Sequence, residues 1–84
     1  MAIFERVQRV TAETLSKGLS EVKPESNFTS NLGADSLDRV ELIIALENEF
    51  SSPDKKLEIS DEEVERLLTV MDVVNYLKER MANA

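Results

Sequence analysis

Residues 32–50 of the chain read LGADSLDRVELIIALENEF, and the apolar residues in this stretch recur at helical spacing. The pattern predicts an amphipathic helix from Ser36 to Phe50. Asp35 is a favoured N-cap residue, and Asp38 follows three positions later, so the two aspartates can form a capping box at the helix start. Ser36 then points outward beside N–H groups at the positive end of the helix dipole. Because such a helix end suits a phosphate, the local chemistry favours a phosphoserine derivative at Ser36.

This helix carries apolar side chains on two sides. At about 100° per residue, one stripe is wide enough to face the core, and it consists of Leu42, Ile43, Leu46 and Phe50. A second apolar patch lies on the other side and is interleaved with carboxylates. An apolar centre with an acidic rim suits a protein interface, so we interpret this patch as a docking face. Its residues are Leu37, Val40, Glu41, Ile44 and Glu47. The alternative is that these side chains fill a broader core.

The segments before this helix predict one helix and one long loop. Apolar spacing indicates a helix from about Ile3 to Ser16, with Gly18 as its C-cap. Residues 19–34 contain Pro, Asn, Ser and Gly without sustained helical periodicity, which is typical of a loop. Loops of this length are uncommon in compact domains and tend to be functional. We expect four apolar residues to pin it to the core, namely Leu19, Val22, Phe28 and Leu32.

Two further helices are predicted after residue 50. Ser60 followed by Glu63 forms a capping box that opens a short helix. Thr69 is a suitable N-cap for a last helix over residues 70–81, where apolar residues follow a spacing of three and four. The sequence therefore predicts an all-α fold in one domain over residues 1–84. We expect a four-helix bundle of three longer helices and one short helix, with a long first loop.

Composition excludes several classes of function. The chain has 84 residues, a formal net charge of −7, and neither Cys nor His. Disulfides, thiolate metal ligands and the commonest general base are therefore absent, and we expect neither an enzyme nor a metal site. No apolar run approaches the roughly 20 residues of a membrane span, and no secretory signal opens the sequence. We expect a soluble, intracellular monomer.

The acidic charge is concentrated in two segments. Residues 35–50 and residues 58–66 each hold five acids and one base. Such a surface attracts basic partners and repels nucleic acid and anionic lipid. The alternative is a solvated acidic surface that only keeps the protein soluble.

The stretch from Leu32 to Phe50 resembles the prosthetic-group segment of the bacterial and organellar acyl carrier proteins. The resemblance covers nearly the whole chain and weakens between Phe50 and Ile59, where the loop at residues 51–58 is longer than in common bacterial carriers. In that family the serine of the Asp-Ser-Leu motif carries phosphopantetheine through a phosphodiester, and a terminal thiol holds the acyl chain as a thioester. The resemblance therefore implies phosphopantetheine on Ser36.

The resemblance also implies the partners of this site. Asp35 and Asp38 would meet the basic patch and the Mg²⁺-dependent site of the phosphopantetheinyl transferase that installs the group from coenzyme A. The helix beginning at Ser36 would be the recognition element for enzymes with basic docking patches. The acyl chain would insert between helices into an apolar interior, and the residues expected to line it are Ile43, Leu46, Ile59, Leu67, Leu68 and Val73.

Arg39 departs from the family pattern, in which a small or apolar residue is more usual at this point. Its angle of about 200° directs it toward the core stripe of the helix. We expect its methylenes to lie on the core edge and its guanidinium to reach solvent or a nearby carboxylate.

The expected function is a carrier that moves growing fatty acyl chains between enzymes of type II fatty acid synthesis. We expect it in the cytoplasm, or in an organellar stroma or matrix if a transit peptide has been removed. The Asp-Ser-Leu motif does not separate this role from a carrier of a polyketide, peptide or D-alanine pathway, although the acidic helix favours the fatty acid type. An unmodified acidic helical adaptor is a further alternative, consistent with the lack of Cys and His.

Overall fold

In the computed structural model, which describes residues 2–82, the chain forms four α-helices. They are α1 (Ala2–Leu15), α2 (Ser36–Phe50), α3 (Asp61–Arg66) and α4 (Val70–Ala82). A short 3-10 helix, η1 (Leu19–Glu21), lies between α1 and α2. Within the described residues there is no β-strand, and only two isolated β-bridges occur. These elements confirm the predicted all-α fold with three longer helices and one short helix.

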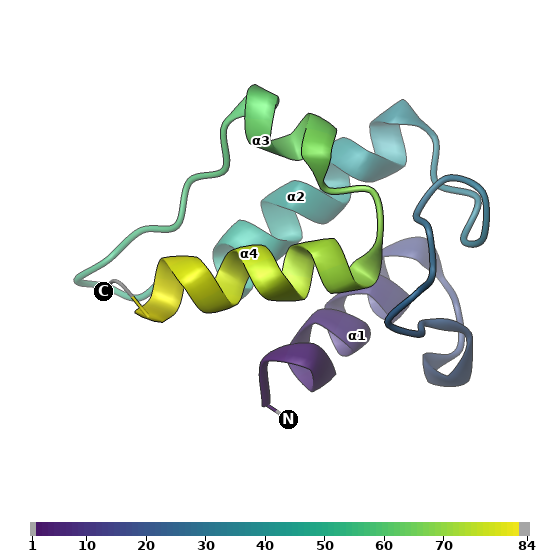
Figure 1. The fold of residues 1–84 in the computed structure, drawn as a ribbon, viewed down its shortest axis with the longest axis horizontal. Coiled ribbons are helices and arrows are strands. Elements are labelled where there is room, and N and C mark those ends of the chain that lie inside the picture. The colour runs from purple at the N-terminus through teal and green to yellow at the C-terminus, as the bar shows by residue number, and fades with distance from the viewer. Residues whose placement is uncertain (1, 83–84) are drawn as a thin grey trace.

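The helices enclose one apolar core. α1 packs against both α2 and α4, while α3 lies across the side of the bundle opposite α1 (Figure 1). The buried apolar side chains form one cluster, which consists of Val7, Val10, Ala12, Val22, Phe28, Leu32, Ala34, Leu42, Leu46, Ile59, Leu67, Val70, Val73, Val74 and Leu77. Every side chain of α3 is exposed or half-buried, so its main apolar anchor is Leu67, immediately after its last residue. Within α3 itself, Val64 is the residue that packs against the core.

The predicted C-cap of the first helix is wrong. α1 ends at Leu15, and Ser16 adopts the left-handed conformation with a φ of 56°. The Lys17 N–H then donates to the Ala12 carbonyl at 2.8 Å, which is the bond that closes a Schellman motif. Gly18 is extended, with a φ of −73°, and precedes η1. The left-handed residue that ends the helix is therefore Ser16, two positions before Gly18.

The long first loop is held to the core at three of the four predicted positions. Val22, Phe28 and Leu32 are buried, whereas Leu19 is 55% exposed, so the prediction for Leu19 is wrong. Leu19 instead opens η1, where its carbonyl accepts bonds from the Gln8 side chain and the Val22 N–H. Its backbone is tied to the protein while its side chain faces water.

Backbone hydrogen bonds fasten the same loop to the start of α4. The Val70 N–H donates to the Ser26 carbonyl at 2.9 Å, and the Met71 N–H donates to the Pro24 carbonyl at 2.9 Å. These N–H groups belong to the first turn of α4 and have no carbonyl partner within the helix. The loop thus caps α4, and this connection fixes the path along which the chain approaches α2.

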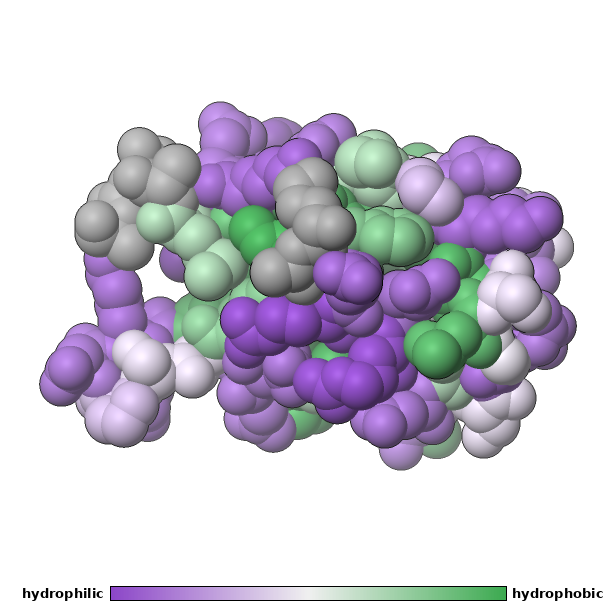
Figure 2. Space-filling model, turned by 90° about the horizontal axis from the view of Figure 1, so that it is seen from below, coloured by the Kyte–Doolittle hydropathy of each residue, from purple (hydrophilic) through white to green (hydrophobic). Residues whose placement is uncertain are grey.

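The connection between α2 and α3 begins with a tight turn. Ser52 N–H donates to the Lys55 carbonyl at 2.7 Å, and Lys55 N–H donates back to the Ser52 carbonyl at 3.1 Å. Figure 2 shows this end of the molecule from the α1 side, where a largely polar lobe projects from the body of the protein. The chain then returns to the core at Ile59, which is buried.

Candidate functional site

The start of α2 is fixed by the predicted pair of aspartates. Asp35 is the extended N-cap residue, and its Oδ1 accepts a hydrogen bond from the Asp38 N–H at 2.8 Å. In return, Asp38 Oδ2 accepts from the Asp35 N–H at 3.2 Å. Both arms of the capping box are therefore present, as predicted. Ser36 is the first helical residue, and its side chain is exposed.

The turn before Asp35 brings the chain from the core to the surface. Gly33 has a φ of 69°, and in the described part of the chain nothing lies within 4 Å of the place that a Cβ would occupy. Glycine is therefore needed for its backbone conformation and not for space. The next residue, Ala34, is buried, and its N–H donates to the Phe28 carbonyl at 2.8 Å. With Ala34 anchored, the following residues emerge into solvent at Ser36.

Ser36 stands at the edge of an open groove between α2 and the segment leading into α3. The groove has a volume of about 350 Å³ and is lined by Ser36, Arg39, Val40, Ile43, Ile44, Glu47, Ile59, Asp61 and Val64. Five of these side chains are aliphatic. A flexible chain attached at Ser36 can therefore lie against apolar surface without entering the core.

Next to this groove the side chains leave a small gap. It measures about 10 Å³ and is lined by Phe28, Arg39, Leu42, Ile43, Leu67 and Val73. A gap of this size holds at most one water molecule. Arg39 and Ile43 line both the groove and the gap, so the two spaces adjoin at these side chains.

Five of the six side chains predicted to line an apolar interior lie in or against the core. Leu46, Ile59, Leu67 and Val73 are buried, and Ile43 is half-buried. Leu68 is 51% exposed and lies at neither the groove nor the gap, so its place in that set is corrected.

The backbone explains the position of Leu68. The Leu68 carbonyl accepts from the Phe28 N–H at 3.0 Å, and the Leu68 N–H donates to Asp72 Oδ2 at 3.1 Å. The chain between α3 and α4 is non-helical at this point, and neighbouring side chains of such a segment point to opposite sides. Leu67 takes the inward position, and Leu68 therefore faces water.

The candidate docking face is exposed on α2. Leu37, Val40 and Ile44 have exposed fractions of 67%, 55% and 51%, and Glu41 is also exposed. These values exclude the alternative that the apolar members fill a broader core. Glu47 differs from the others, because it is half-buried and its Oε2 accepts a hydrogen bond from a backbone N–H in the loop before α3, at 2.8 Å.

Arg39 is half-buried and reaches across to α3. Its Nη2 donates to the Val64 carbonyl at 3.1 Å and to the Leu67 carbonyl at 3.5 Å. The expectation of solvent or a carboxylate is therefore wrong. The Val64 carbonyl also accepts from the Leu67 N–H at 3.1 Å, and a carbonyl has room for this second donor. Both carbonyls lie at the negative end of the helix dipole, which attracts a guanidinium.

Sequence reasoning missed an ionic cluster that joins α1 to α2. Arg6 Nε and Arg9 Nη2 both donate to Glu49 Oε2, at 2.9 Å and 2.8 Å, and Arg6 also donates to the Glu49 carbonyl at 2.7 Å. The bond from Arg6, followed by that from Arg9, lowers the pKa of Glu49. The Arg6 guanidinium also lies 4.3 Å from the centre of the Phe50 ring. The sequence gives only the charges themselves, on two helices that were predicted to pack together, and does not indicate which residues pair.

A second cluster joins α3 to α4. Glu63 Oε1 accepts from the Ser60 N–H at 3.1 Å and from the Tyr76 hydroxyl at 3.0 Å, and these bonds lower the pKa of Glu63. Burial, followed by the bond to Glu63, raises the pKa of Tyr76. Arg80 donates to the Tyr76 hydroxyl, which extends the network along α4. This network holds the second capping box, which the sequence predicted, against the last helix.

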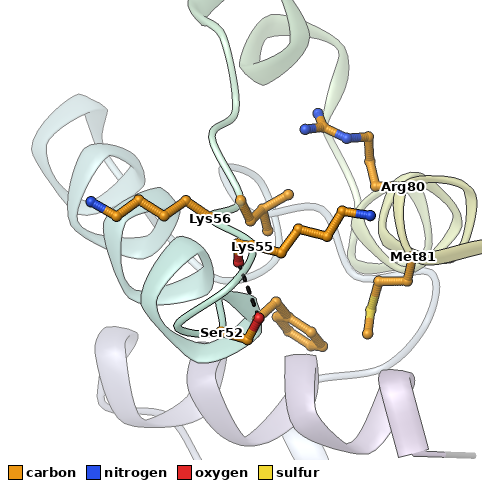
Figure 3. A pocket seen from close by; sticks show the side chains of 7 residues that line it. Ser52, Lys55, Lys56, Arg80 and Met81 are labelled. Atoms are coloured by element: carbon orange, nitrogen blue, oxygen red, sulfur yellow. Dashed lines mark hydrogen bonds between the residues drawn. The ribbon is translucent and has the colours of Figure 1, made fainter. Parts of the chain in front are cut away.

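A separate opening lies at the far end of α2. It has a volume of about 280 Å³ and is lined by Phe50, Ser52, Lys55, Lys56, Leu57, Arg80 and Met81. Lys55 extends toward Arg80 and Met81 on α4, whereas Lys56 points away from that helix (Figure 3). At 1.5 Å per residue along α2, this opening is roughly 20 Å from Ser36. It is therefore separate from the site at the start of α2.

The site thus has an exposed serine at a capped helix start, beside an apolar groove on a small helical domain. A family model described as "Phosphopantetheine attachment site" matches residues 5–77, so the chain belongs to this family. Phosphopantetheine is accordingly its cofactor, and the protein is a phosphopantetheine-carrying carrier protein. Such domains are typically carriers without enzymatic activity, and they work with acyl chains and enzyme partners. Within residues 2–82, no helix is both long and apolar enough to cross a membrane.

Proposed function

We propose that Ser36 Oγ forms the phosphodiester with phosphopantetheine, and that the loaded protein carries acyl chains between enzymes of type II fatty acid synthesis. The observation that carries the attachment is the position of Ser36, exposed as the first residue of a fifteen-residue helix and beside an apolar groove. When bound, the group supplies a thiol that holds an acyl chain as a thioester. Ser36 also lies inside the matched residues 5–77.

Other serines fit this role less well. Ser26 is buried, and its Oγ donates to the Glu21 carbonyl at 3.2 Å. Ser60 is the N-cap of α3, and its Oγ already accepts from the Glu63 N–H at 3.2 Å. At the start of α2 the cap is supplied by Asp35, which leaves the Ser36 hydroxyl exposed.

The residues around Ser36 have separate tasks. The reciprocal bonds of Asp35 and Asp38 hold the backbone of the helix start in one conformation, so Ser36 is kept at the exposed first position of α2. The first N–H groups of α2 lack intrahelical partners and favour an anionic phosphodiester. The two carboxylates also present negative charge to the basic patch and the Mg²⁺-dependent site of a phosphopantetheinyl transferase. Neither aspartate is required to act as an acid or a base.

The exposed face of α2 serves as the docking surface for partner enzymes in this proposal. Leu37, Val40 and Ile44 supply the apolar centre, and Glu41 supplies charge beside it. Partners with a basic rim around an apolar pocket complement this face, and electrostatic attraction accelerates their association. The acidic character of α2 favours the fatty acid pathway over a polyketide, peptide or D-alanine pathway. We place the protein in the cytoplasm or an organellar stroma or matrix, as a monomer without catalytic activity of its own.

Intact-mass measurement tests the attachment. Incubation with coenzyme A and a phosphopantetheinyl transferase is expected to add the mass of one phosphopantetheinyl group to the wild type and nothing to Ser36→Ala. Ser30→Ala, which changes an exposed loop serine, serves as the matched control and is expected to be modified like the wild type. Modification of Ser36→Ala, or a wild type that several transferases leave unmodified, would overturn the attachment. The acyl chains recovered from the purified protein identify the pathway.

A further inference from the structure

Arg39 lies one turn after Ser36 and spans the boundary between α2 and α3. Its guanidinium donates to the Val64 and Leu67 carbonyls, at 3.1 Å and 3.5 Å. These carbonyls terminate a helix of six residues whose own side chains are all exposed or half-buried. The buried Leu67 side chain and the bond between Tyr76 and Glu63 also hold α3, and the Arg39 bonds are the ones that join its end to α2 beside Ser36.

The same side chain borders two spaces. One is the groove at Ser36, with a volume of about 350 Å³. The other is the gap of about 10 Å³ that Phe28, Leu42 and Val73 also line. The two spaces share the lining residues Arg39 and Ile43, so the direct path of a hydrocarbon chain from Ser36 into the gap passes these two side chains. The gap must also expand, because its present volume is smaller than any alkyl chain.

We propose that Arg39 is a latch that closes the interior of the bundle to a hydrocarbon chain held at Ser36, and so confines the chain to the external groove. While the bonds to Val64 and Leu67 are made, the end of α3 stays against α2 and the path is closed. Breaking them frees the end of α3 to move away and joins the groove to the gap. Arg39 thereby sets how much of a chain the protein can shelter. This inference rests on the proposed attachment at Ser36.

A chemically attached chain tests the latch without a transferase. The sequence contains no Cys, so Ser36→Cys introduces a single thiol at the start of α2. Its thiolate attacks the thiol-side sulfur of a butyl, octyl or dodecyl methanethiosulfonate, forms a mixed disulfide with the alkyl group and releases methanesulfinate. The melting temperature is then measured for each chain length and compared with that of the underivatised protein.

Three versions of the Ser36→Cys protein separate the latch from a general loss of stability. One retains Arg39, one carries Arg39→Met, which keeps an aliphatic stem but removes the donors, and one carries Arg66→Met. Arg66 is an exposed arginine on α3, and its side chain forms no hydrogen bond or ion pair within residues 2–82, so it controls for the lost charge. Arg39→Lys, which keeps the charge and one donor group, serves as a fourth version if Arg39→Met does not fold.

We expect the gain in melting temperature to depend on alkyl chain length differently in the protein with Arg39 and in Arg39→Met. With Arg39 present, and equally with Arg66→Met, the gain in melting temperature levels off after the butyl group, because further methylenes remain in the open groove. With Arg39→Met the gain continues to rise, by about 3–6 °C for each methylene that becomes fully buried. With Arg39→Lys the rise is intermediate. Equal dependence on chain length with and without the guanidinium would overturn the latch, even if Arg39→Met lowers the melting temperature of every derivative.

Amide hydrogen exchange, measured without any attached alkyl chain, is a second test of the latch. Arg39→Met is expected to speed exchange at residues 64–67 by about tenfold relative to the core amides of α1 and α4. Unchanged exchange there would also contradict the latch. Neither measurement requires phosphopantetheine. The melting temperatures and the exchange rates therefore test the role of Arg39 alone. A wild type that takes no prosthetic group would instead contradict the proposed function.

Discussion

Glu47 Oε2 accepts a hydrogen bond from the backbone N–H of Ile59 at 2.8 Å. The bond connects the last third of α2 to the loop that leads into α3, and Ile59 is the point at which this loop enters the core. Two neighbouring bonds support this loop, from the Leu57 N–H to Ser51 Oγ at 2.8 Å and from Arg80 to the Glu58 carbonyl at 3.4 Å. A residue at the margin of the docking face therefore helps to hold one wall of the groove beside Ser36.

Removing this acceptor is expected to destabilise the fold. Glu47→Ala leaves the Ile59 N–H without its partner, and we expect the free energy of unfolding to fall by about 1–2 kcal/mol. Glu47→Gln keeps an acceptor oxygen and is expected to lose less. Urea denaturation of both variants measures the effect, with Glu41→Ala as the control, because Glu41 is exposed on the same helix. A loss with Glu41→Ala as large as that with Glu47→Ala would contradict the structural role of Glu47.

Two substitutions of Asp35, in the capping box at the start of α2, distinguish its effect on folding from its effect on recognition by the transferase. Asp35→Ala removes the acceptor for the Asp38 N–H and is expected to lower the free energy of unfolding by about 1 kcal/mol. Asp35→Asn keeps an acceptor oxygen and is expected to retain most of the stability while it loses the charge. If the charge of Asp35 contacts the transferase, both variants are modified more slowly than the wild type. If Asp35→Asn is modified at the wild-type rate, the charge of Asp35 does not contribute to recognition by the transferase, and the residue acts only as a helix cap.

The helices and the exposed position of Ser36 were predictable because their signals are local. A capping box and an apolar period fix the start and the core face of α2 within a few residues of sequence, and the structure has both. The same holds for Ser60 with Glu63 and for Thr69 with Asp72, whose side chains cap each other's backbone N–H groups.

The errors fall where a distant partner decides the outcome. Arg39 was expected to reach solvent or a carboxylate, because nothing near it in sequence indicates the carbonyls of α3. The exposure of Leu68 depends on bonds to Phe28 and Asp72, and the exposure of Leu19 depends on a loop whose backbone, not its side chain, is anchored. These are tertiary contacts, and neither apolar periodicity nor residue type predicts them.

The exposed face of α2 predicts that binding and stability respond to different substitutions. Ile44→Ala and Glu41→Lys are expected to weaken binding to partner enzymes, by about tenfold for Glu41→Lys, because they remove apolar area or reverse a charge at an interface. Both are expected to change the free energy of unfolding by less than about 0.5 kcal/mol. Leu42→Ala, on the buried side of the same helix, is expected to cost about 2–5 kcal/mol. Unchanged partner affinity with a lower melting temperature for Ile44→Ala would place that residue in the core.

The cluster of Glu49 with Arg6 and Arg9 predicts how stability depends on pH. The two guanidinium bonds lower the pKa of Glu49 in the folded state below its ordinary value of 4.5. A carboxyl with a lowered pKa stabilises the fold above its unfolded pKa, and this contribution disappears as the pH falls through the folded pKa. Glu49→Gln is therefore expected to be less stable than the wild type by about 1 kcal/mol at neutral pH. The difference is expected to narrow as the pH falls below 4.5.

Thermal melts of the two proteins across this pH range measure the difference directly. Glu41→Gln is the matched control, because it removes an exposed carboxylate that, within residues 2–82, has no ion pair. Its difference from the wild type is expected to stay small at every pH. Added salt is expected to reduce the Glu49→Gln effect only in part, because the Glu49 side chain is 22% exposed and mobile ions screen such a pair less than a fully solvated one. A Glu49→Gln difference that is the same at neutral and acid pH would show that Glu49 acts through packing and not through its charge.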